Sequence, residues 1–378
     1  MRSTSTALPR PARIPLACAA LLVAGCGADN GGPVSPAGGT PGILDLPAGW
    51  TVMEPGGDTT CARDTPFSYY VRPGTVNRLV VEFRGGGACW DALTCSFAGS
   101  TFQETVGSDP WVTDEAQAKG IYDHQNPDNP FKDWHHVYIP YCTGDIHWGD
   151  NVMTYGSGQS ATTIHHKGAV NVRAALDWVY ENVPAPEKIF VTGCSAGAYG
   201  AILWSAHVRE HYPKAEVHEL ADSGAGIVSD TFFQDSYPAW NAGQAYPTWI
   251  PGVSGEAVQK LPALYASIGN HYPDMKLAQY NTVYDEDQIF FFKAMGGGDA
   301  EEWSTAMRAS VAEIASSTPS FRYYLAPGEE HCAIPYEKFY TAESNGVRLV
   351  DWIRERVEGK PVESVDCEGA ACAAPSSP

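Results

Sequence analysis

The most informative segment of the chain is Lys188-Ile189-Phe190-Val191-Thr192-Gly193-Cys194-Ser195-Ala196-Gly197-Ala198-Tyr199-Gly200-Ala201. Its first half is a run of apolar and β-branched residues, typical of a buried strand, and its second half favours a helix. Between them, Gly193, Ser195 and Gly197 form a Gly-x-Ser-x-Gly pattern whose small residues permit a sharp strand-to-helix turn. A helix N-terminus at this turn favours developing negative charge. The pattern predicts that Ser195 is a nucleophile.

Similar apolar runs, each followed by a Gly-rich or polar turn, lie on both sides of this segment. They predict strands at 78–83, 136–140, 188–192, 216–220 and 321–325, with helices at 169–182, 198–210 and 347–357. Strands that alternate with helices are typical of an α/β, doubly wound, mainly parallel sheet whose site lies at the carboxyl ends of the strands. Residues 230–270 are rich in Pro, Gly, Trp and Tyr without a clear period. We therefore expect an α/β-hydrolase-like fold with an inserted cap.

A nucleophilic serine needs a general base, and the base needs a carboxylate that orients it. Among the eleven histidines, only His331 follows the last predicted strand and precedes a final helix. In α/β hydrolases the acid lies between the serine and the histidine in the chain, and Asp285 fits this order. Spacing alone leaves Glu286, Asp287 and Asp222 as further candidates.

Acyl transfer also needs backbone N–H groups aimed at the developing oxyanion. One usually belongs to the residue after the nucleophile, here Ala196. The loop 85–88, Gly-Gly-Gly-Ala, follows an early predicted strand and offers further N–H groups, because glycine lets the backbone approach a ligand closely. We expect this loop to complete the oxyanion hole.

The N-terminus is typical of an export signal, with three arginines, an apolar run at 14–23 and then Ala24-Gly25-Cys26. The run is too short to span a bilayer, and residues 22–26 resemble a bacterial lipobox. We predict a lipoprotein signal peptide at 1–25, lipidation at Cys26, a flexible tether at 26–43, a catalytic domain at 44–365 and a tail at 366–378. The protein is expected to be lipid-anchored to a bacterial outer membrane or cell surface, or secreted after ordinary signal cleavage.

Eight of the ten cysteines remain after the signal and the lipidation site are set aside. An even number in an exported chain suggests up to four disulfides. Cys89 with Cys95, and Cys367 with Cys372, are close enough for local bridges. No CxxC pair occurs and the paired histidines are adjacent rather than at ligand spacing, so we predict no metal site.

Two further cysteines adjoin the proposed nucleophile and base. Cys194 precedes Ser195 and Cys332 follows His331. If the serine and the histidine hydrogen-bond, their neighbours come within reach of a disulfide. We expect a Cys194–Cys332 bridge that fixes the spacing between nucleophile and base.

The charge balance bears on the partners of the 378-residue chain. It has 24 basic and 44 acidic residues, and three of the basic ones lie in the predicted signal, which leaves a net charge of −23 after cleavage. Such a surface repels phosphate backbones, so we expect no nucleic-acid partner. It also disfavours tight binding of polyanionic pectin.

Several segments together resemble the pectin acetylesterase and Notum family of serine carboxylesterases. They are Phe83-Arg84-Gly85-Gly86-Gly87-Ala88-Cys89-Trp90-Asp91, Pro140-Tyr141-Cys142-Thr143-Gly144-Asp145, Gly193-Cys194-Ser195-Ala196-Gly197, Ala221-Asp222-Ser223-Gly224, Tyr284-Asp285-x-x-Gln288 and His331-Cys332. The resemblance implies that Ser195 is the nucleophile, His331 the base and Asp285 the orienting acid. It also implies an oxyanion hole of Gly86, Gly87 and Ala196, and no cofactor. Family members often carry a bulky aromatic where this chain has Gly87, which implies a different acyl pocket.

These observations favour a secreted, lipid-anchored serine carboxylesterase, expected to be a monomer, that removes acyl groups, most simply acetyl, from a polysaccharide. Two different functions stay open. One is that of a non-catalytic surface lipoprotein that binds glycans or a protein on a hydrolase fold. The other is that of a lipid or protein deacylase, which would need a deep apolar acyl pocket.

Overall fold

The computed structural model describes residues 42–96, 101–107, 109–254 and 260–373. The predicted signal peptide, the lipidation site at Cys26 and nearly all of the tether lie outside these residues. Within the described ranges, no helix combines the length and the apolar character needed to cross a membrane.

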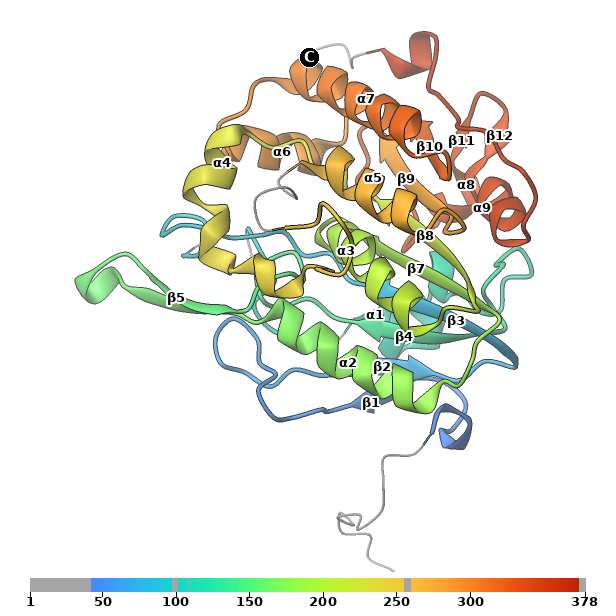
Figure 1. Cartoon of the computed structure of the whole chain (residues 1–378), viewed down its shortest axis with the longest axis horizontal. Helices are drawn as coiled ribbons and strands as arrows, with labels where there is room; N and C mark the ends of the chain where they lie inside the picture. Colours follow the sequence, from blue (N-terminus) through green and yellow to red (C-terminus); the bar gives the residue numbers. More distant parts are fainter. Residues whose placement is uncertain (1–41, 97–100, 108, 255–259, 374–378) are drawn as a thin grey trace, which may run out of the picture. The chain divides into compact units, whose positions relative to one another are not determined.

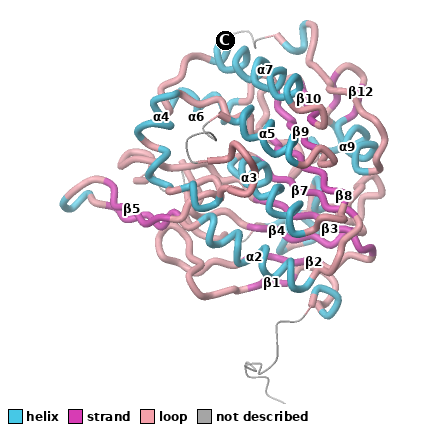
Figure 2. Tube along the Cα trace, viewed as in Figure 1, coloured by secondary structure: helices cyan, strands magenta, loops and turns pink. Residues whose placement is uncertain are grey.

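An eight-stranded sheet forms the centre of the domain, in the strand order β1-β2-β4-β3-β7-β8-β9-β10 (Figures 1 and 2). The six strands from β4 to β10 in this order run parallel, and β1 and β2 are antiparallel additions at one edge. The bounds are β1 (Thr51–Met53), β2 (Tyr69–Arg72), β3 (Val76–Phe83), β4 (Trp134–Ile139), β7 (Lys188–Cys194), β8 (Glu216–Asp222), β9 (Leu277–Thr282) and β10 (Phe321–Ala326). The predicted α/β, mainly parallel sheet is confirmed.

Helices cover both faces of the sheet, as its apolar strands require. Along β3, Leu79 and Val81 pack in the same core cluster as residues of α2, α3, α5 and α7, whereas Val80 packs in a second cluster with residues of α8 and α9. The helices are α1 (Pro110–Thr113), α2 (Gly168–Asn182), α3 (Ala196–His211), α4 (Asp230–Asp235), α5 (Leu261–His271), α6 (Glu286–Ala294), α7 (Ala300–Ser317), α8 (Lys338–Thr341) and α9 (Leu349–Val357). The last predicted helix begins two residues later than expected, because Val347 and Arg348 form the short strand β12, paired with β11 (Glu343–Ser344).

The strand order reverses at β3, which lies between β4 and β7. Phe83 at the end of β3 pairs with Gly193 near the end of β7. In doubly wound sheets such a switch point leaves a crevice at the carboxyl ends of the strands. The topology therefore brings the glycine loop after β3 next to the Gly-x-Ser-x-Gly turn after β7.

The predicted cap contains α4, α5 and two short 3-10 helices, Tyr237–Trp240 and Ala242–Ala245. Its aromatics Tyr237, Trp240 and Tyr246 are buried, whereas Trp249 is 40% exposed. Trp240 donates its indole N–H to the carbonyl of Cys89 at 2.8 Å, which ties the cap to the segment after the glycine loop. The buried aromatic side chains therefore pack the interior of the cap.

A β-hairpin of β5 (Asn151–Tyr155) and β6 (Thr162–His166) projects from the domain at the left of Figure 1. Sequence analysis did not predict it, because polar residues occupy most of its positions and give no strong periodicity.

Four disulfides join all eight cysteines of the described residues: Cys61–Cys142, Cys89–Cys95, Cys194–Cys332 and Cys367–Cys372. Three of these pairs were predicted, and the sequence left Cys61 and Cys142 unassigned. This bridge links the loop before β2 to the loop after β4, across 81 residues of chain.

The Cys61–Cys142 bridge should contribute more to stability than the local bridge at the C-terminus, because it closes a far longer loop in the unfolded chain. We expect the double variant Cys61→Ala/Cys142→Ala to lose about 2–4 kcal/mol of unfolding free energy in urea denaturation. The control Cys367→Ala/Cys372→Ala, with a separation of 5 residues, should lose about 2 kcal/mol less. Equal losses in the two variants would contradict the loop-closure explanation.

Candidate active site

Ser195 lies at the turn between β7 and α3 with φ 59° and ψ −124°. A Cβ on Gly197 would lie 2.0 Å from the carbonyl oxygen of Phe83, and one on Gly193 would lie 2.3 Å from that of Gly197. Only glycine fits these positions, so the sequence forces a tight turn. A non-glycine residue at positive φ costs roughly 1–3 kcal/mol and persists only where its surroundings impose it.

The glycine loop adjoins this turn and is held from its other side. Gln103 N–H donates to the carbonyl of Gly86 at 2.8 Å, and Ala88 N–H donates to that of Thr101 at 3.0 Å. Gly87 has φ 71°, and a Cβ there would lie 1.9 Å from the Thr101 carbonyl oxygen. Any side chain larger than that of glycine is therefore excluded at this position by backbone geometry.

The N–H groups expected to form the oxyanion hole belong to Gly86, Gly87 and Ala196. Among the described residues, none of the three donates a hydrogen bond. Ala196 begins α3, where the first N–H groups of a helix have no intrahelical acceptor. These donors are therefore free to bind an anionic oxygen next to Ser195.

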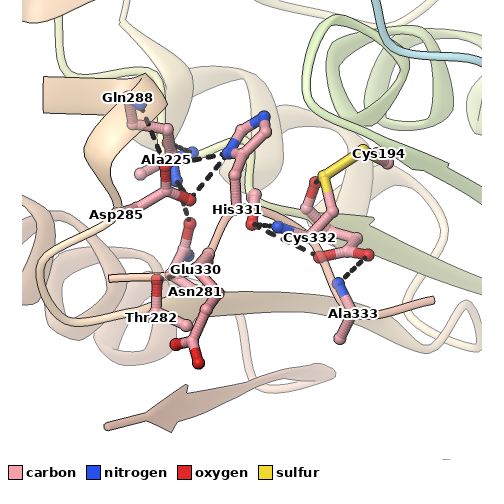
Figure 3. Close-up of polar contacts among 12 residues, drawn as sticks. Cys194, Ala225, Asn281, Thr282, Asp285, Gln288, Glu330, His331, Cys332 and Ala333 are labelled. Atoms are coloured by element: carbon pink, nitrogen blue, oxygen red, sulfur yellow. Dashed lines mark hydrogen bonds and ion pairs between the residues drawn. A yellow bond between two sulfur atoms is a disulfide. The ribbon is translucent and has the colours of Figure 1, made fainter. Parts of the chain in front are cut away.

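His331 and Asp285 form a hydrogen-bonded pair (Figure 3). Nδ1 of His331 lies 2.8 Å and 2.9 Å from the two carboxylate oxygens of Asp285, which is completely buried. The other ring nitrogen, Nε2, is buried and has no hydrogen-bond partner within the described part of the chain. Ser195 and His331 line the same cavities. The structure thus brings the predicted serine, histidine and aspartate to one site.

Gln288 holds the carboxylate of Asp285 in place. Asp285 caps α6 and accepts hydrogen bonds from the Gln288 backbone N–H at 2.9 Å and from its side-chain amide at 3.0 Å. The same amide donates to Asn281 at 3.0 Å, and its oxygen accepts from Ala225 N–H at 2.8 Å (Figure 3). The role of Gln288 was not predicted from the sequence. The three-residue spacing from an Asp at a helix start was the available signal.

Asp222, a candidate acid on spacing alone, contacts the loop of the histidine rather than its ring. Its carboxylate accepts N–H bonds from Ala333 at 2.9 Å and Ile334 at 2.8 Å, and its carbonyl accepts the N–H of Ser195 at 2.9 Å. Burial raises its pKa to about 6, although these N–H bonds oppose the shift. Glu286 and Asp287, whose spacing also suited the orienting acid, are exposed at the start of α6.

The Cys194–Cys332 disulfide reinforces this connection, with a Cα–Cα distance of 5.7 Å. Ser223 Oγ accepts the N–H of Cys332 at 3.0 Å. The residues beside Ser195 and His331 are therefore joined by a covalent bond and by hydrogen bonds to the end of β8.

His147 is buried beneath the glycine loop. Its Nε2 lies 2.8 Å from the carbonyl of Arg84, and its ring packs against Phe83 and Tyr141. Burial lowers its pKa to about 4, so the neutral ring donates this hydrogen bond at pH 7. His147 therefore supports the start of the glycine loop.

The pKa of His331 is set by two opposing effects. Burial alone lowers it, but the hydrogen bond and charge of Asp285, with the charges of Asp287 and Asp222, raise it above its ordinary value. The imidazolium is thus stabilised by the surrounding carboxylates. A base that must hold a proton during catalysis benefits from this arrangement.

Two cavities meet at Ser195 and His331. The apolar cavity, of about 90 Å³, is lined mainly by apolar side chains. They come largely from the cap and its surroundings and include Ile146, Trp148, Phe232, Trp240, Leu261 and Met295. The polar cavity, of about 330 Å³, is lined among others by Glu82, Arg84, Gln103, Trp111, Asp287 and Tyr336.

Two clusters of the described residues approach the geometry of a metal site. Each contains both cysteines of a disulfide, with His166 beside Cys89 and Cys95, and His331 beside Cys194 and Cys332. Because a disulfide offers no thiolate, neither cluster has the donors of a zinc site.

The sheet topology and the strand-turn-helix arrangement at Ser195 define an α/β-hydrolase-like protein. The pectinacetylesterase family model matches residues 51–248, just over half of the chain. The chain therefore belongs to the pectinacetylesterase family, as its sequence motifs indicated. The matched region includes Ser195 and the glycine loop but ends before Asp285 and His331, so the placement of those two residues rests on the structure.

Curated relatives include plant and animal esterases. The chain is 29% identical over 191 residues to pectin acetylesterase 11 of Arabidopsis thaliana, which covers 50% of this chain and 46% of that protein. It is 28% identical over 178 residues to palmitoleoyl-protein carboxylesterase NOTUM of Schmidtea mediterranea, which covers 46% of this chain and 32% of that protein. The chain thus spans between a third and a half of these relatives.

Asparagine variants of Asp285 and Asp222 should distinguish the carboxylate that orients His331 from the carboxylate that binds the loop after it. We expect Asp285→Asn to lower kcat by about 10⁴-fold, because an amide favours the wrong histidine tautomer. Asp222→Asn keeps one acceptor oxygen for the loop, so kcat should stay within about tenfold. The measurement is steady-state hydrolysis of a 4-nitrophenyl ester. The opposite order of effects would make Asp222 the orienting acid.

The raised pKa of His331 should be visible in the pH profile of kcat/KM. The base must be neutral at Nε2 to accept a proton, so activity should fall as pH decreases through the pKa of the folded protein. We expect the midpoint of this acid limb above 6.5, the ordinary value for histidine. Removing one contributing charge with Asp287→Asn should move it to lower pH. A midpoint below 6.5 would show that burial outweighs the carboxylates.

Proposed function

We propose that the protein is a serine carboxylesterase with the triad Ser195, His331 and Asp285. Ser195 attacks the ester carbonyl while His331 Nε2 takes the hydroxyl proton, and Asp285 stabilises the imidazolium that forms. The oxyanion is bound by the N–H groups of Gly86, Gly87 and Ala196. His331 then passes its proton to the departing alcohol, which leaves an acyl-enzyme.

Water completes the cycle. His331 removes a proton from a water molecule as it attacks the acyl-enzyme, and returns that proton to Ser195 when the carboxylic acid leaves. The observation that carries this proposal is the buried, unpartnered Nε2 of His331, described above, at the cavities that also contain Ser195. All steps use groups of this chain, so no cofactor is required.

The two cavities divide the ester between them. The acyl group is apolar and suits the apolar cavity, which leaves the polar cavity for the alcohol. The volume of about 90 Å³ is several times the roughly 10–15 Å³ that one water needs. An acetyl group therefore enters easily and leaves part of the space unfilled. We propose acyl chains of short to medium length.

The substrate is proposed to be an acylated glycan outside the cytoplasm. The names of the plant relatives mention pectin acetyl esters, and the disulfides of this chain fit an oxidising compartment. Lipidation at Cys26 would hold the enzyme at a bacterial membrane, with residues 26–43 as the tether. A monomer suffices, because one chain supplies every proposed catalytic group.

A deacylase function gains support from the same apolar cavity, since a protein or lipid acyl ester would use it in the same way. The name of the animal relative mentions a palmitoleoyl ester. A non-catalytic binding function has less support, because its expected mark is a lost catalytic group or a blocked cavity, and the serine, histidine and aspartate lie together at an open site.

Hydrolysis of 4-nitrophenyl esters of increasing chain length tests both catalysis and acyl size. We expect kcat/KM to rise from acetate to an optimum between butyrate and octanoate, with palmitate at least tenfold below the optimum. Ser195→Ala, which removes only the hydroxyl oxygen, should lower kcat by at least 10⁴-fold. Equal low rates in both proteins would exclude catalysis by Ser195, and an optimum at palmitate would favour the deacylase.

A further inference from the structure

We propose that the polar cavity binds the alcohol part of the ester as an uncharged sugar, and that Asp287 discriminates against sugars that carry a carboxylate. This inference rests on the proposed function. It names the alcohol that the esterase accepts and a residue that determines specificity for it.

The position of the cavity assigns it to the alcohol. It shares Gly87, Ser195, Phe291 and His331 with the apolar cavity, and the remaining lining residues of the two cavities differ. An ester bound at Ser195 extends to both sides of its carbonyl carbon. With the acyl chain in the apolar cavity, the alcohol has to occupy the polar one.

Among the described residues, Arg84 is the only arginine or lysine that lines the polar cavity, and it is already paired. Arg84 contacts Asp109 at 2.7 Å, and the side chain of Asp109 is buried. Trp111 lies under the same guanidinium, at 5.9 Å. If a substrate carboxylate replaced Asp109 as the partner of Arg84, Asp109 would be left buried without its ion pair, which is unfavourable. Arg84 therefore offers little net positive charge to a uronic acid.

Glu82 also lines the polar cavity and is paired with His136. Its side chain is buried, accepts a hydrogen bond from Tyr122 at 2.5 Å and lies 2.7 Å from Nε2 of His136. Burial raises the pKa of Glu82 to about 8 and lowers that of His136 to about 3. This buried pair therefore adds no full charge to the cavity near neutral pH.

Asp287 is the remaining charged carboxylate of the lining, and it is exposed at the first turn of α6. Its charge acts on His331, whose pKa it helps to raise, so it lies close enough to influence groups at the reacting centre. Because Arg84 and Glu82 are each paired with a buried partner, Asp287 gives the cavity a negative potential. A carboxylate on the alcohol would be repelled, and a neutral ring would not.

The cavity also offers apolar surface for a sugar ring. Phe290 and Tyr336 line it and are 50% and 44% exposed. Exposed aromatic side chains beside polar groups are typical of ligand sites, and their faces suit the C–H face of a pyranose. The buried aromatics of the cap cannot serve this purpose. An uncharged, ring-shaped alcohol thus fits both the charge and the surface.

The test compares two esters that differ in one group: a mono-O-butyryl methyl glucoside and the matching methyl glucuronic acid, with acid release followed in a pH-stat. We expect the wild type to have the higher kcat/KM on the glucoside. The ratio of kcat/KM for the glucuronate to that for the glucoside should increase about three- to tenfold in Asp287→Asn. Using a ratio within each protein cancels any change in the pKa of His331.

Glu286→Gln is the matched control, because Glu286 is the neighbouring exposed carboxylate on α6 and does not line the cavity. It removes the same charge and should leave the ratio within twofold of the wild type. An unchanged ratio in Asp287→Asn, an equal increase in both variants, or a wild-type preference for the glucuronate would overturn the proposal. Failure of the proposed function looks different, since the wild type would then hydrolyse every ester no faster than Ser195→Ala.

Discussion

The geometry of the site depends on one anchoring point, the carboxyl end of β8. There the carbonyl of Asp222 binds the N–H of Ser195, while its carboxylate binds the loop that follows His331. A buried carboxylate is costly unless its oxygens are hydrogen-bonded, and in this protein the bonds that satisfy it also fix the separation of two segments far apart in the sequence. The disulfide between Cys194 and Cys332 spans the same gap. Nucleophile and base are thus both held by one central strand of the sheet.

This arrangement shows how much of the site the sequence could predict. Ser195 was identified because Gly193 and Gly197 permit a tight strand-to-helix turn, which is a local property of the sequence. His331 and Asp285 were identified by their order along the chain. The choice between Asp285 and Asp222 could not be made from spacing, because both aspartates follow strands of the same sheet. Only the three-dimensional contacts show which carboxylate meets the ring and which meets the loop.

The fold was predicted where strands are buried on both faces, as in β3 and β7, because their composition then departs strongly from that of loops. It was missed in β1 and β2 at one edge, in the polar β5–β6 hairpin and in the helix α7. It was also missed in the buried strand β9, where the polar residues Gln279, Asn281 and Thr282 interrupt the apolar pattern. The cap was located by composition, but the use of its aromatics was not predictable. Trp240 could have faced solvent or core, and its indole bond to Cys89 shows that it packs inward. The apolar cavity is lined by residues from several segments that are far apart in the sequence, so no single segment predicts it.

The bridge between Cys194 and Cys332 also relates the site to the compartment in which the polypeptide becomes oxidised. A reducing cytosol keeps thiols unpaired, so a newly made chain would reach its final covalent form only where oxidants are available. The bond joins residues 138 positions apart, one at the end of β7 and the other in the loop after β10. A chain of this kind would acquire this covalent link between nucleophile and base only after it had left a reducing compartment.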